Sequence, residues 1–379
     1  MKKKRIFISG FSFIILGIIN ALGEKFLYEQ EAIGSNHVKH KFIKPIFFAT
    51  TLFFGVSLSL IAYVFLSLIG KNGYPPLSKL QKWTFFKFII PGFFDLFQGV
   101  MSSVTSALIG VSIDYMLRSA TLVGVSIIAR FYFKRRFKSY EIIGILIVTV
   151  SLLLVGMSSV INADISSTVH VSKKWAIVIL ILKLLSQATY SIELSLDQYY
   201  TQQRRVHCMV VSGFQSFWAF LIGALILLPL SNKMPGKDGN GLHESFDDTI
   251  LMLKNSKSIV IIIGMCVVIE SIYQMSSVAL TESTSAVIRT LVESFRTFIL
   301  WLLQLAIFYG FKGHPSLQKY RGIGEEWSKG SWLQLFGYFL LLSGLMVYRG
   351  FKPNKIKFEK DKLEINNQDY VKLDSELSI

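Results

Sequence analysis

Two stretches of this chain decide its fold: Ser112–Ser119 reads SIDYMLRS and Ser283–Thr290 reads STSAVIRT. Both contain a serine, five residues, an arginine and a second hydroxyl residue, and they lie 171 residues apart. Each follows a hydrophobic segment after a very short turn, so we expect the same membrane hairpin twice. An arginine at the centre of a bilayer costs roughly 2.5–3.5 kcal/mol. Two of them, Arg118 and Arg289, at equivalent positions indicate a polar path through the membrane.

The composition is that of a membrane protein. Hydrophobic residues make up 52% of the 379 residues, charged residues only 17%, and the mean hydropathy is +0.49. A segment of about 20 apolar residues is long enough to cross a bilayer. Ten such segments are predicted, at roughly 6–23, 44–69, 84–106, 111–132, 138–160, 174–197, 207–230, 257–280, 285–309 and 331–350.

The formal net charge of +16 comes from lysines and arginines in the connections and tails. Most of them fall on one side of the predicted membrane, which the positive-inside rule assigns to the cytosol. Both termini are therefore expected to be cytosolic, and nucleic acid is not an expected partner. The turn-rich connection at about 231–257 is expected on the opposite side, with limited order.

The two halves of the chain predict an inverted repeat. Five spans are followed by a polar connector and then by five more, and because five is odd the second copy enters the bilayer from the opposite face. We therefore expect an all-α polytopic membrane protein with ten transmembrane helices in a 5+5 inverted repeat. The predicted units are residues 1–5 as a cytosolic segment, 6–156 as the first repeat, 157–173 as a connector, 174–350 as the second repeat and 351–379 as a disordered cytosolic tail.

Short sequence matches spread over about residues 6–350 point to a family. They are Asn20-Ala21-Leu22 with Lys25, Pro91 with Asp95, Met116-Leu117-Arg118, and Ser285-Ala286 with Arg289, Glu293, Ser294, Arg296 and Thr297. With these motifs the chain resembles the drug/metabolite transporter superfamily, and within it the solute carrier 35 F-type, F6-like proteins. A more distant similarity is to the chloroquine-resistance transporters, which are endolysosomal exporters of small organic solutes.

The resemblance implies a ten-helix carrier whose spans 1, 3, 4, 6, 8 and 9 line a central cavity. This chain departs from the F6-like pattern at Tyr115, where that branch usually has glutamine, and at Ser119, where it usually has glycine. The changed cavity wall means that the solute of a relative does not transfer directly to this chain.

Charged and polar residues inside the predicted spans are the candidates for solute binding or gating. Arg289, Glu293 and Arg296 recur at i, i+4 and i+7, which places them on one face of span 9. Arginine forks match carboxylate and phosphate groups, so this face favours an anionic solute. Alternatively, Glu293 neutralises both arginines and only links span 9 to its neighbours. Arg118 has the same two interpretations, because Asp114 precedes it by one helical turn.

Other spans carry similar polar faces. In span 6 the polar residues Lys183, Gln187, Tyr190 and Glu193 line one face, although Lys183 and Tyr190 are also typical of anchors at the membrane interface. Glu270 in span 8 is the preferred candidate for a protonatable coupling residue. The complete set of predicted binding or gating residues is Asn20, Asp95, Gln98, Tyr115, Arg118, Ser119, Gln187, Tyr190, Glu193, Glu270, Tyr273, Gln274, Ser285, Arg289, Glu293 and Arg296.

Enzymatic, metal and cofactor motifs are not found in the sequence. It contains no G-x4-G-K-[ST], H-E-x-x-H or G-x-S-x-G pattern, and its two cysteines form no C-x-x-C pair. We therefore expect no catalytic residues, no cofactor and no metal. The expected partners are a small-molecule substrate and membrane lipid, with the protein as a monomer or homodimer.

The tail carries Tyr370-Val371-Lys372-Leu373, which resembles a sorting signal read by adaptor proteins. It suggests an intracellular membrane such as the lysosome, endosome or Golgi. Three functions follow from the sequence. The first is a secondary carrier, by exchange or proton coupling, for a small anionic solute such as a nucleotide-sugar. The second is a carrier of amino acids, peptides or cationic drugs, for which acidic residues would matter most. The third is a non-transporting membrane interaction protein.

Overall fold

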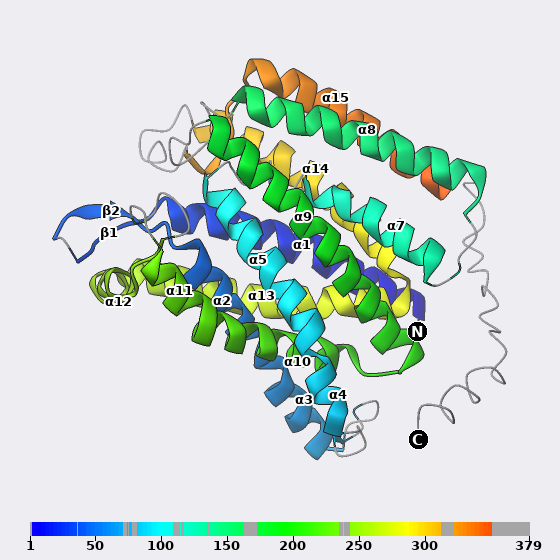
Figure 1. Cartoon of the computed structure of the whole chain (residues 1–379), viewed down its shortest axis with the longest axis horizontal. Coiled ribbons are helices and arrows are strands. Elements are labelled where there is room, and N and C mark those ends of the chain that lie inside the picture. The colour runs from blue at the N-terminus through cyan, green and yellow to red at the C-terminus, as the bar shows by residue number, and fades with distance from the viewer. Residues whose placement is uncertain are drawn as a thin grey trace.

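The structure is a computed structural model that describes residues 2–35, 37–70, 74, 76–77, 82–108, 114, 117–132, 134, 137–162, 173–234, 238, 243–311 and 322–350. These residues form helices and one small two-stranded sheet (Figure 1). In the first half the elements are α1 Lys2–Tyr28, β1 Glu31–Ile33, β2 Lys39–Lys41, α2 Pro45–Ser57, α3 Ser59–Leu68, α4 Lys82–Lys87, α5 Ile89–Leu108, α7 Thr121–Phe131 and α8 Ser139–Asn162. In the second half they are α9 Lys173–Gln198, α10 Cys208–Ile222, α11 Leu228–Lys233, α12 Phe246–Asn255, α13 Lys257–Ser283, α14 Ala286–Phe311 and α15 Lys329–Arg349.

Eight described helices or helix pairs are long and apolar enough to cross a membrane. They cover Lys4–Tyr28, Pro45–Leu68, Trp83–Leu108, Ile177–Gln203, Cys208–Lys233, Lys257–Ser283, Ala286–Phe311 and Gly330–Tyr348. Two shorter apolar stretches, Thr121–Phe131 and Ser139–Ser151, lie within the remaining two predicted spans. The polytopic all-α class is therefore confirmed, whereas the count of ten spans and the 5+5 repeat stay predictions.

The surface is apolar and much of the interior is polar, as expected when lipid rather than water surrounds a bundle. Phe7, Leu146, Trp175 and Phe336 are each more than half exposed. Many charged and amide side chains are buried instead, including Arg289, which is fully buried. Burying a charge is costly unless it is paired, so the interior charges determine how the helices are arranged.

Proline marks two helix boundaries. Pro91 has no N–H and its ring clashes with the carbonyl four residues earlier, at Lys87. The chain breaks there, with α4 ending at Lys87 and α5 beginning at Ile89. Pro45 occupies the first position of α2, where its fixed φ suits a helix start. The predicted third span is thus a broken helix whose longer part is α5.

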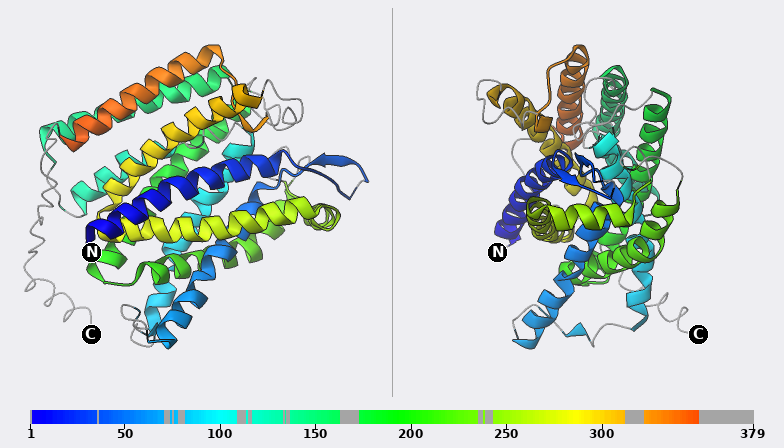
Figure 2. Two further views of the ribbon diagram at one scale, coloured as in Figure 1. Left: turned by 180° about the vertical axis from the view of Figure 1, so that it is seen from behind. Right: turned by 90° about the vertical axis from the view of Figure 1, so that its left-hand side faces the viewer.

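The long helices pack in pairs. α8 lies along α15, α1 along α13, and α5 along α9 (Figures 1 and 2). α8 and α15 approach closely because Gly144 faces the backbone of Tyr348, a use of small residues that is common between membrane helices. The first residues of α1 and the last residues of α15 lie at the same end of the bundle (Figure 2).

The opposite end is closed by the β1–β2 hairpin and α12. Lys44, which is 1% exposed, forms ion pairs with Asp238 and with Asp248, the latter at 2.8 Å. Burial alone would raise the pKa of Asp248, but hydrogen bonds from Lys44 and from the backbone N–H of Ser35 hold that pKa well below its usual range. These contacts join the connection after α1 to the connection before α13.

Glu244 completes this end by capping α2. Its carboxylate accepts the backbone N–H groups of Ile46 and Phe47, at 2.5 and 2.9 Å, in the first turn of the helix. Burial raises the pKa of Glu244 to about 7, even though the two N–H groups act in the other direction. The limited order predicted for the connection at about 231–257 was wrong for Phe246–Asn255, which forms α12 with Ser245 as its N-cap.

Candidate functional site

The predicted site residues that the structure describes gather mainly in the interior between α1, α5, α9, α13 and α14. Those classed as buried are Asn20, Asp95, Gln98, Gln187, Tyr190, Glu193, Tyr273, Gln274, Arg289, Glu293 and Arg296. Arg118 and Glu270 are partly buried. Helical periodicity in the sequence therefore selected residues that lie in one interior. It did not show which residues on other helices they contact.

The first cluster surrounds Asp114. Lys183 of α9 forms an ion pair with it at 2.6 Å, and neither side chain is exposed. Arg118 pairs with the same carboxylate at 3.3 Å. Ser102 of α5 donates to Asp114 and accepts from both cations. Lys183 is therefore not an interface anchor: it lies in the interior and connects α9 to α5 and to Asp114.

The second cluster surrounds Arg289. Its guanidinium donates to Tyr190 at 2.8 Å and pairs with Asp197 at 3.4 Å, and both partners lie on α9. Glu193, between them on the same helix, accepts a hydrogen bond from Gln215 of α10 at 3.2 Å. The arginine of the second hairpin is held by α9 rather than directed toward lipid.

The third cluster surrounds Arg296, one face of which is covered by aromatic rings. Arg296 pairs with Glu293 at 3.3 Å and lies 5.3 Å from the ring centre of Phe13 and 5.1 Å from that of Tyr273. Glu293 is also 3.8 Å from Arg118, so it links this cluster to the first. Guanidinium groups favour such positions over aromatic faces.

Glu270 lies opposite α1. One of its carboxylate oxygens accepts a hydrogen bond from the side-chain amide of Asn20 at 2.6 Å. Asp95 and Gln98 lie one helical turn apart on α5, and both side chains are buried. Asp95 Oδ2 and Gln98 Nε2 have no hydrogen-bond partner among the described residues. Buried polar atoms of this kind need a ligand, a water or a proton.

Two predicted residues have structural contacts instead. Ser285 caps the start of α14, where its hydroxyl accepts the N–H of Ile288 at 3.3 Å. Gln187 accepts a hydrogen bond from Thr121 of α7 at 2.8 Å and joins α7 to α9. Tyr115, the side chain of Ser119, and the tail residues Tyr370 and Leu373 lie outside the described residues.

Asp114, Asp197 and Ser102 were not selected from the sequence as site residues. Asp197 continues the polar face of α9 by one further turn, four residues after Glu193, and this spacing could have identified it. Ser102 gave no comparable signal, because serine is common in membrane helices.

The charges in this interior do not balance. Its four cations are Arg118, Lys183, Arg289 and Arg296, and each lies within 4 Å of a carboxylate. Its seven described carboxyl groups are Glu24, Asp95, Asp114, Glu193, Asp197, Glu270 and Glu293. Four of these, Glu24, Asp95, Glu193 and Glu270, have no salt-bridge cation among the described residues. The interior is therefore acidic, unless protons neutralise the excess.

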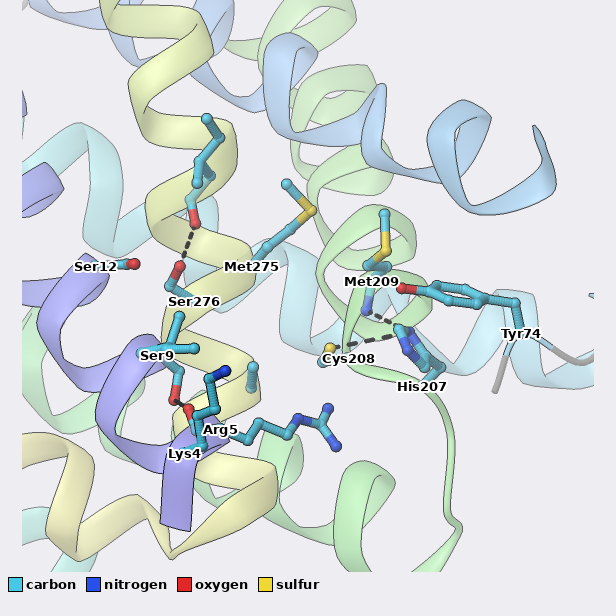
Figure 3. A pocket seen from close by; sticks show the side chains of 13 residues that line it. Lys4, Arg5, Ser9, Ser12, Tyr74, His207, Cys208, Met209, Met275 and Ser276 are labelled. Atoms are coloured by element: carbon cyan, nitrogen blue, oxygen red, sulfur yellow. Dashed lines mark hydrogen bonds between the residues drawn. The ribbon is translucent and has the colours of Figure 1, made fainter. Parts of the chain in front are cut away.

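A separate hollow of about 490 Å³ lies where α1 begins, beside α13 and the first turn of α10 (Figure 3). Lys4 and Arg5 line it on one side, and His207 and Cys208 on the other. His207 caps α10 by accepting the N–H of Met209. Burial and then the nearby Arg5 lower the pKa of His207 to about 4, so its ring is neutral there. The lining includes none of the predicted site residues that the structure describes.

No cluster of three or more histidine, cysteine, aspartate or glutamate residues among the described residues could hold a metal ion.

Curated proteins similar to the whole chain carry one name. Solute carrier family 35 member F6 of Mus musculus is 22% identical over 365 residues, which cover 94% of this chain and 91% of the mouse protein. The Homo sapiens protein of that name is 23% identical over 357 residues, which cover 92% of this chain and 89% of the human protein. The resemblance to solute carrier 35 F-type proteins is confirmed. The apolar helices, together with these solute carrier relatives, support a multi-pass membrane transporter.

Other comparisons add the fold alone. No protein-family model matches the chain. A solved crystal structure is similar to it with a TM-score of 0.51 and 14% sequence identity, covering 92% of this chain and 99% of that one. At that identity the likeness extends to the fold and not to the solute carried.

Proposed function

We propose that the protein is a secondary transporter that moves a small cationic or zwitterionic organic solute across an intracellular membrane by alternating access. The observation that carries the proposal is the acidic excess in the buried interior, where every cation is already engaged by a carboxylate. An amine can take the place of a missing counter-ion beside Asp95, Glu193 or Glu270. A charged group inside a membrane bundle is a functional candidate by default, and here the surplus groups are acids.

The helix contacts support the proposed inverted repeat. In an inverted repeat, each helix of the first half has a counterpart in the second half, so each contact between two helices should be matched by a contact between their counterparts. The α1–α13 contact is matched by α9–α5, the α2–α13 contact by α10–α5, and the α1–α14 contact by α9–α7. Counterparts also contact each other directly, in the pairs α2–α10, α7–α14 and α8–α15. A pseudo-twofold relation between the halves is the symmetry that rocking-type carriers use.

Both ends of the interior are bridged across the two halves, as gates would be. At the end where α1 begins, Arg5 pairs with Glu282 of α13 at 2.8 Å. At the other end, Lys44 pairs with Asp248. If one of these sets of contacts breaks while the other holds, the interior can open to one compartment at a time.

The common end of α1 and α15 supports a location of both termini on one side, and the positive-inside rule favours the cytosol for that side. The proposal also places the protein in an endolysosomal or Golgi membrane, where a sorting adaptor would bind Tyr370 and Leu373. This part of the proposal is based on the tail sequence.

An anionic solute is the second candidate, because Arg118 and Arg289 occupy equivalent positions in the two hairpins. For such a solute to bind, it would have to displace Asp197 from Arg289 or Asp114 from Arg118. Displacing Asp197 would leave a buried carboxylate without its cation, at a cost of several kcal/mol. Asp114 would keep Lys183, but the solute would then lie beside a buried carboxylate. The cationic or zwitterionic solute is therefore favoured.

Counterflow in proteoliposomes separates the candidates. Purified protein would be reconstituted and assayed for exchange of a labelled basic amino acid, a neutral amino acid, a quaternary amine and a nucleotide-sugar. We expect amine exchange that is lost in Glu270→Gln and retained in Glu31→Gln, a surface acid in β1. Nucleotide-sugar exchange that is lost in Arg289→Ala would favour the anionic candidate. Absence of exchange for every class, with tail-dependent capture of a protein partner, would favour the non-transporting alternative.

A further inference from the structure

Glu193 and Asp197 form a pair of carboxyl groups inside the bundle. They lie one helical turn apart on α9, and neither side chain is exposed. Side chains four residues apart lie together on one face of a helix, and these two carboxyl groups interact directly. A hydrogen bond between two carboxyl groups needs a proton, because two carboxylates have only acceptor oxygens.

In each of the two acids, one carboxyl oxygen has a hydrogen-bond donor and the other has none among the described residues. One oxygen of Glu193 accepts from Gln215, and one oxygen of Asp197 binds Arg289. The remaining oxygens, Glu193 Oε2 and Asp197 Oδ1, have no donor among the described residues. A buried carboxylate oxygen left in this way is strongly disfavoured. One proton held between the two remaining oxygens satisfies both at once.

The surroundings favour one proton in this pair. Asp95 of α5 and Arg289 of α14 act electrostatically on Glu193. The other charged or titratable groups that border this region are Arg118, Tyr190 on α9, Glu270 and Tyr273 on α13, and Glu293 on α14. Arg289 is the one cation among the described residues that acts on all three of Asp95, Glu193 and Asp197, and Arg118 acts on Asp95 as well, so three ionised acids would outnumber the cations beside them.

We propose that the Glu193–Asp197 pair is a proton-binding site of the transport cycle, and that a proton and the solute amine occupy it in turn. This inference rests on the proposed function and adds the coupling ion to it. The bound proton leaves as a solvated proton to the compartment toward which the interior is open. The carboxylate that it leaves behind then binds the ammonium group of the solute. One proton is thereby exchanged for one amine, with no other bond made or broken. The pair, rather than Glu270, carries the coupling proton.

Asp197 connects this proton to the helix packing. It is the ion-pair partner of Arg289, so it joins α9 to α14 only while it carries negative charge. A proton on Glu193 leaves that pair intact, and loss of the proton adds a second negative charge beside Arg289. Occupancy of the pair therefore changes the attraction between the two helices that line the interior.

Infrared difference spectroscopy tests the proton site without a known solute. The purified protein in lipid nanodiscs would be titrated across neutral pH, with the carbonyl stretch of protonated carboxylic acids as the signal. We expect a titrating band in the wild type that is lost in Glu193→Gln and in Asp197→Asn. The band should remain in Glu141→Gln, which replaces a buried acid that caps α8. Glu193→Gln keeps the shape of the side chain and its amide can donate to Asp197, so the fold should be preserved. Asp197→Asn also removes the carboxylate that pairs with Arg289, so its folding is checked by circular dichroism. A band unchanged in both variants would overturn the proposal.

Transport provides the second arm and distinguishes the two hypotheses. In Glu193→Gln proteoliposomes, we expect amine accumulation driven by a pH gradient to be lost. If wild-type protein exchanges amines but its accumulation ignores the pH gradient, the proton site is wrong and the transporter assignment stands. If no amine is exchanged while the infrared band behaves as expected, the pair binds a proton but the proposed solute class is wrong, and the coupling proposal fails with it.

Discussion

Replacing Asp114 with asparagine should be among the most destabilising single changes in the bundle. The carboxylate of Asp114 lies 2.6 Å from Lys183 Nζ, and both side chains are fully buried. Asp114→Asn leaves an ammonium group whose only other described hydrogen bond is to Ser102, at 3.0 Å. Removing one partner of a buried ion pair costs roughly 3–5 kcal/mol. The detergent-unfolded state shields part of this loss, so we expect about 3 kcal/mol.

The reverse change should cost less, and this asymmetry is the sharper test. Lys183→Met leaves Asp114 with Arg118 at 3.3 Å and with Ser102, so we expect a loss of about 1–2 kcal/mol. The double variant Lys183→Met with Asp114→Asn should recover part of the sum, with a coupling energy of roughly 1–3 kcal/mol.

The assay is unfolding in mixed lipid–detergent micelles titrated with a denaturing detergent, followed by far-ultraviolet circular dichroism. Lys233→Met, which changes an exposed lysine of α11, should alter the unfolding free energy by less than about 0.5 kcal/mol. Strictly additive losses, or a larger loss for Lys183→Met than for Asp114→Asn, would show that Asp114 does not hold Lys183 in a stabilising ion pair.

Three further predictions follow from close contacts and from one titrating group. A Cβ on Gly17 would lie 2.0 Å from the guanidinium of Arg296, so Gly17→Ala should lower the unfolding free energy by about 1–3 kcal/mol and reduce transport. At Gly10 no atom is closer than 4.0 Å to such a Cβ, so Gly10→Ala should change neither the unfolding free energy nor transport. Burial raises the pKa of Glu244 to about 7, so between about pH 4.5 and pH 7 the folded state holds a proton that the unfolded state has lost. The stability of the folded state should therefore fall as pH rises through this range. Thermal melts of Glu244→Gln should lack this fall. Lys44→Ala should speed hydrogen exchange in α12 by about tenfold or more, because it leaves two acids without their lysine; unchanged exchange rates would count against a gate at this end.

The sequence predicts which residues face the interior better than it predicts their partners. The i, i+4, i+7 spacing on span 9 selected Arg289, Glu293 and Arg296, and the structure buries all three. Helical periodicity fixes a face, because side chains three or four residues apart lie together. It does not fix which helix that face meets, so the contact between Arg289 and Asp197, 92 residues apart, could not be foreseen.

The charge balance likewise required the structure. From the sequence, two arginines and one glutamate on span 9 gave a net positive face and an anionic solute. In the bundle, α9 and α5 add Asp197, Glu193 and Asp95 to the same interior, which reverses its sign. The helix α12 had a local signal, since Ser245 is followed by Asp247 and Asp248 in a first turn, but the surrounding glycines and Pro235 favoured a loop.

Cysteine accessibility can show whether the polar interior opens in turn to the two sides of the membrane. The chain has only Cys208 and Cys266, so a cysteine-free background needs two substitutions. Gln98→Cys would place one thiol in the interior, and Val268→Cys, at a position 59% exposed on the apolar surface, would place one toward lipid.

A membrane-impermeant maleimide would then be applied to either side of sealed proteoliposomes. We expect the cysteine at position 98 to react from both sides, and an excess of solute amine to slow that reaction. The cysteine at position 268 should not react from either side. A thiol at position 98 that is unreactive from both sides, in protein shown to be folded, would mean that the interior does not open to the two compartments.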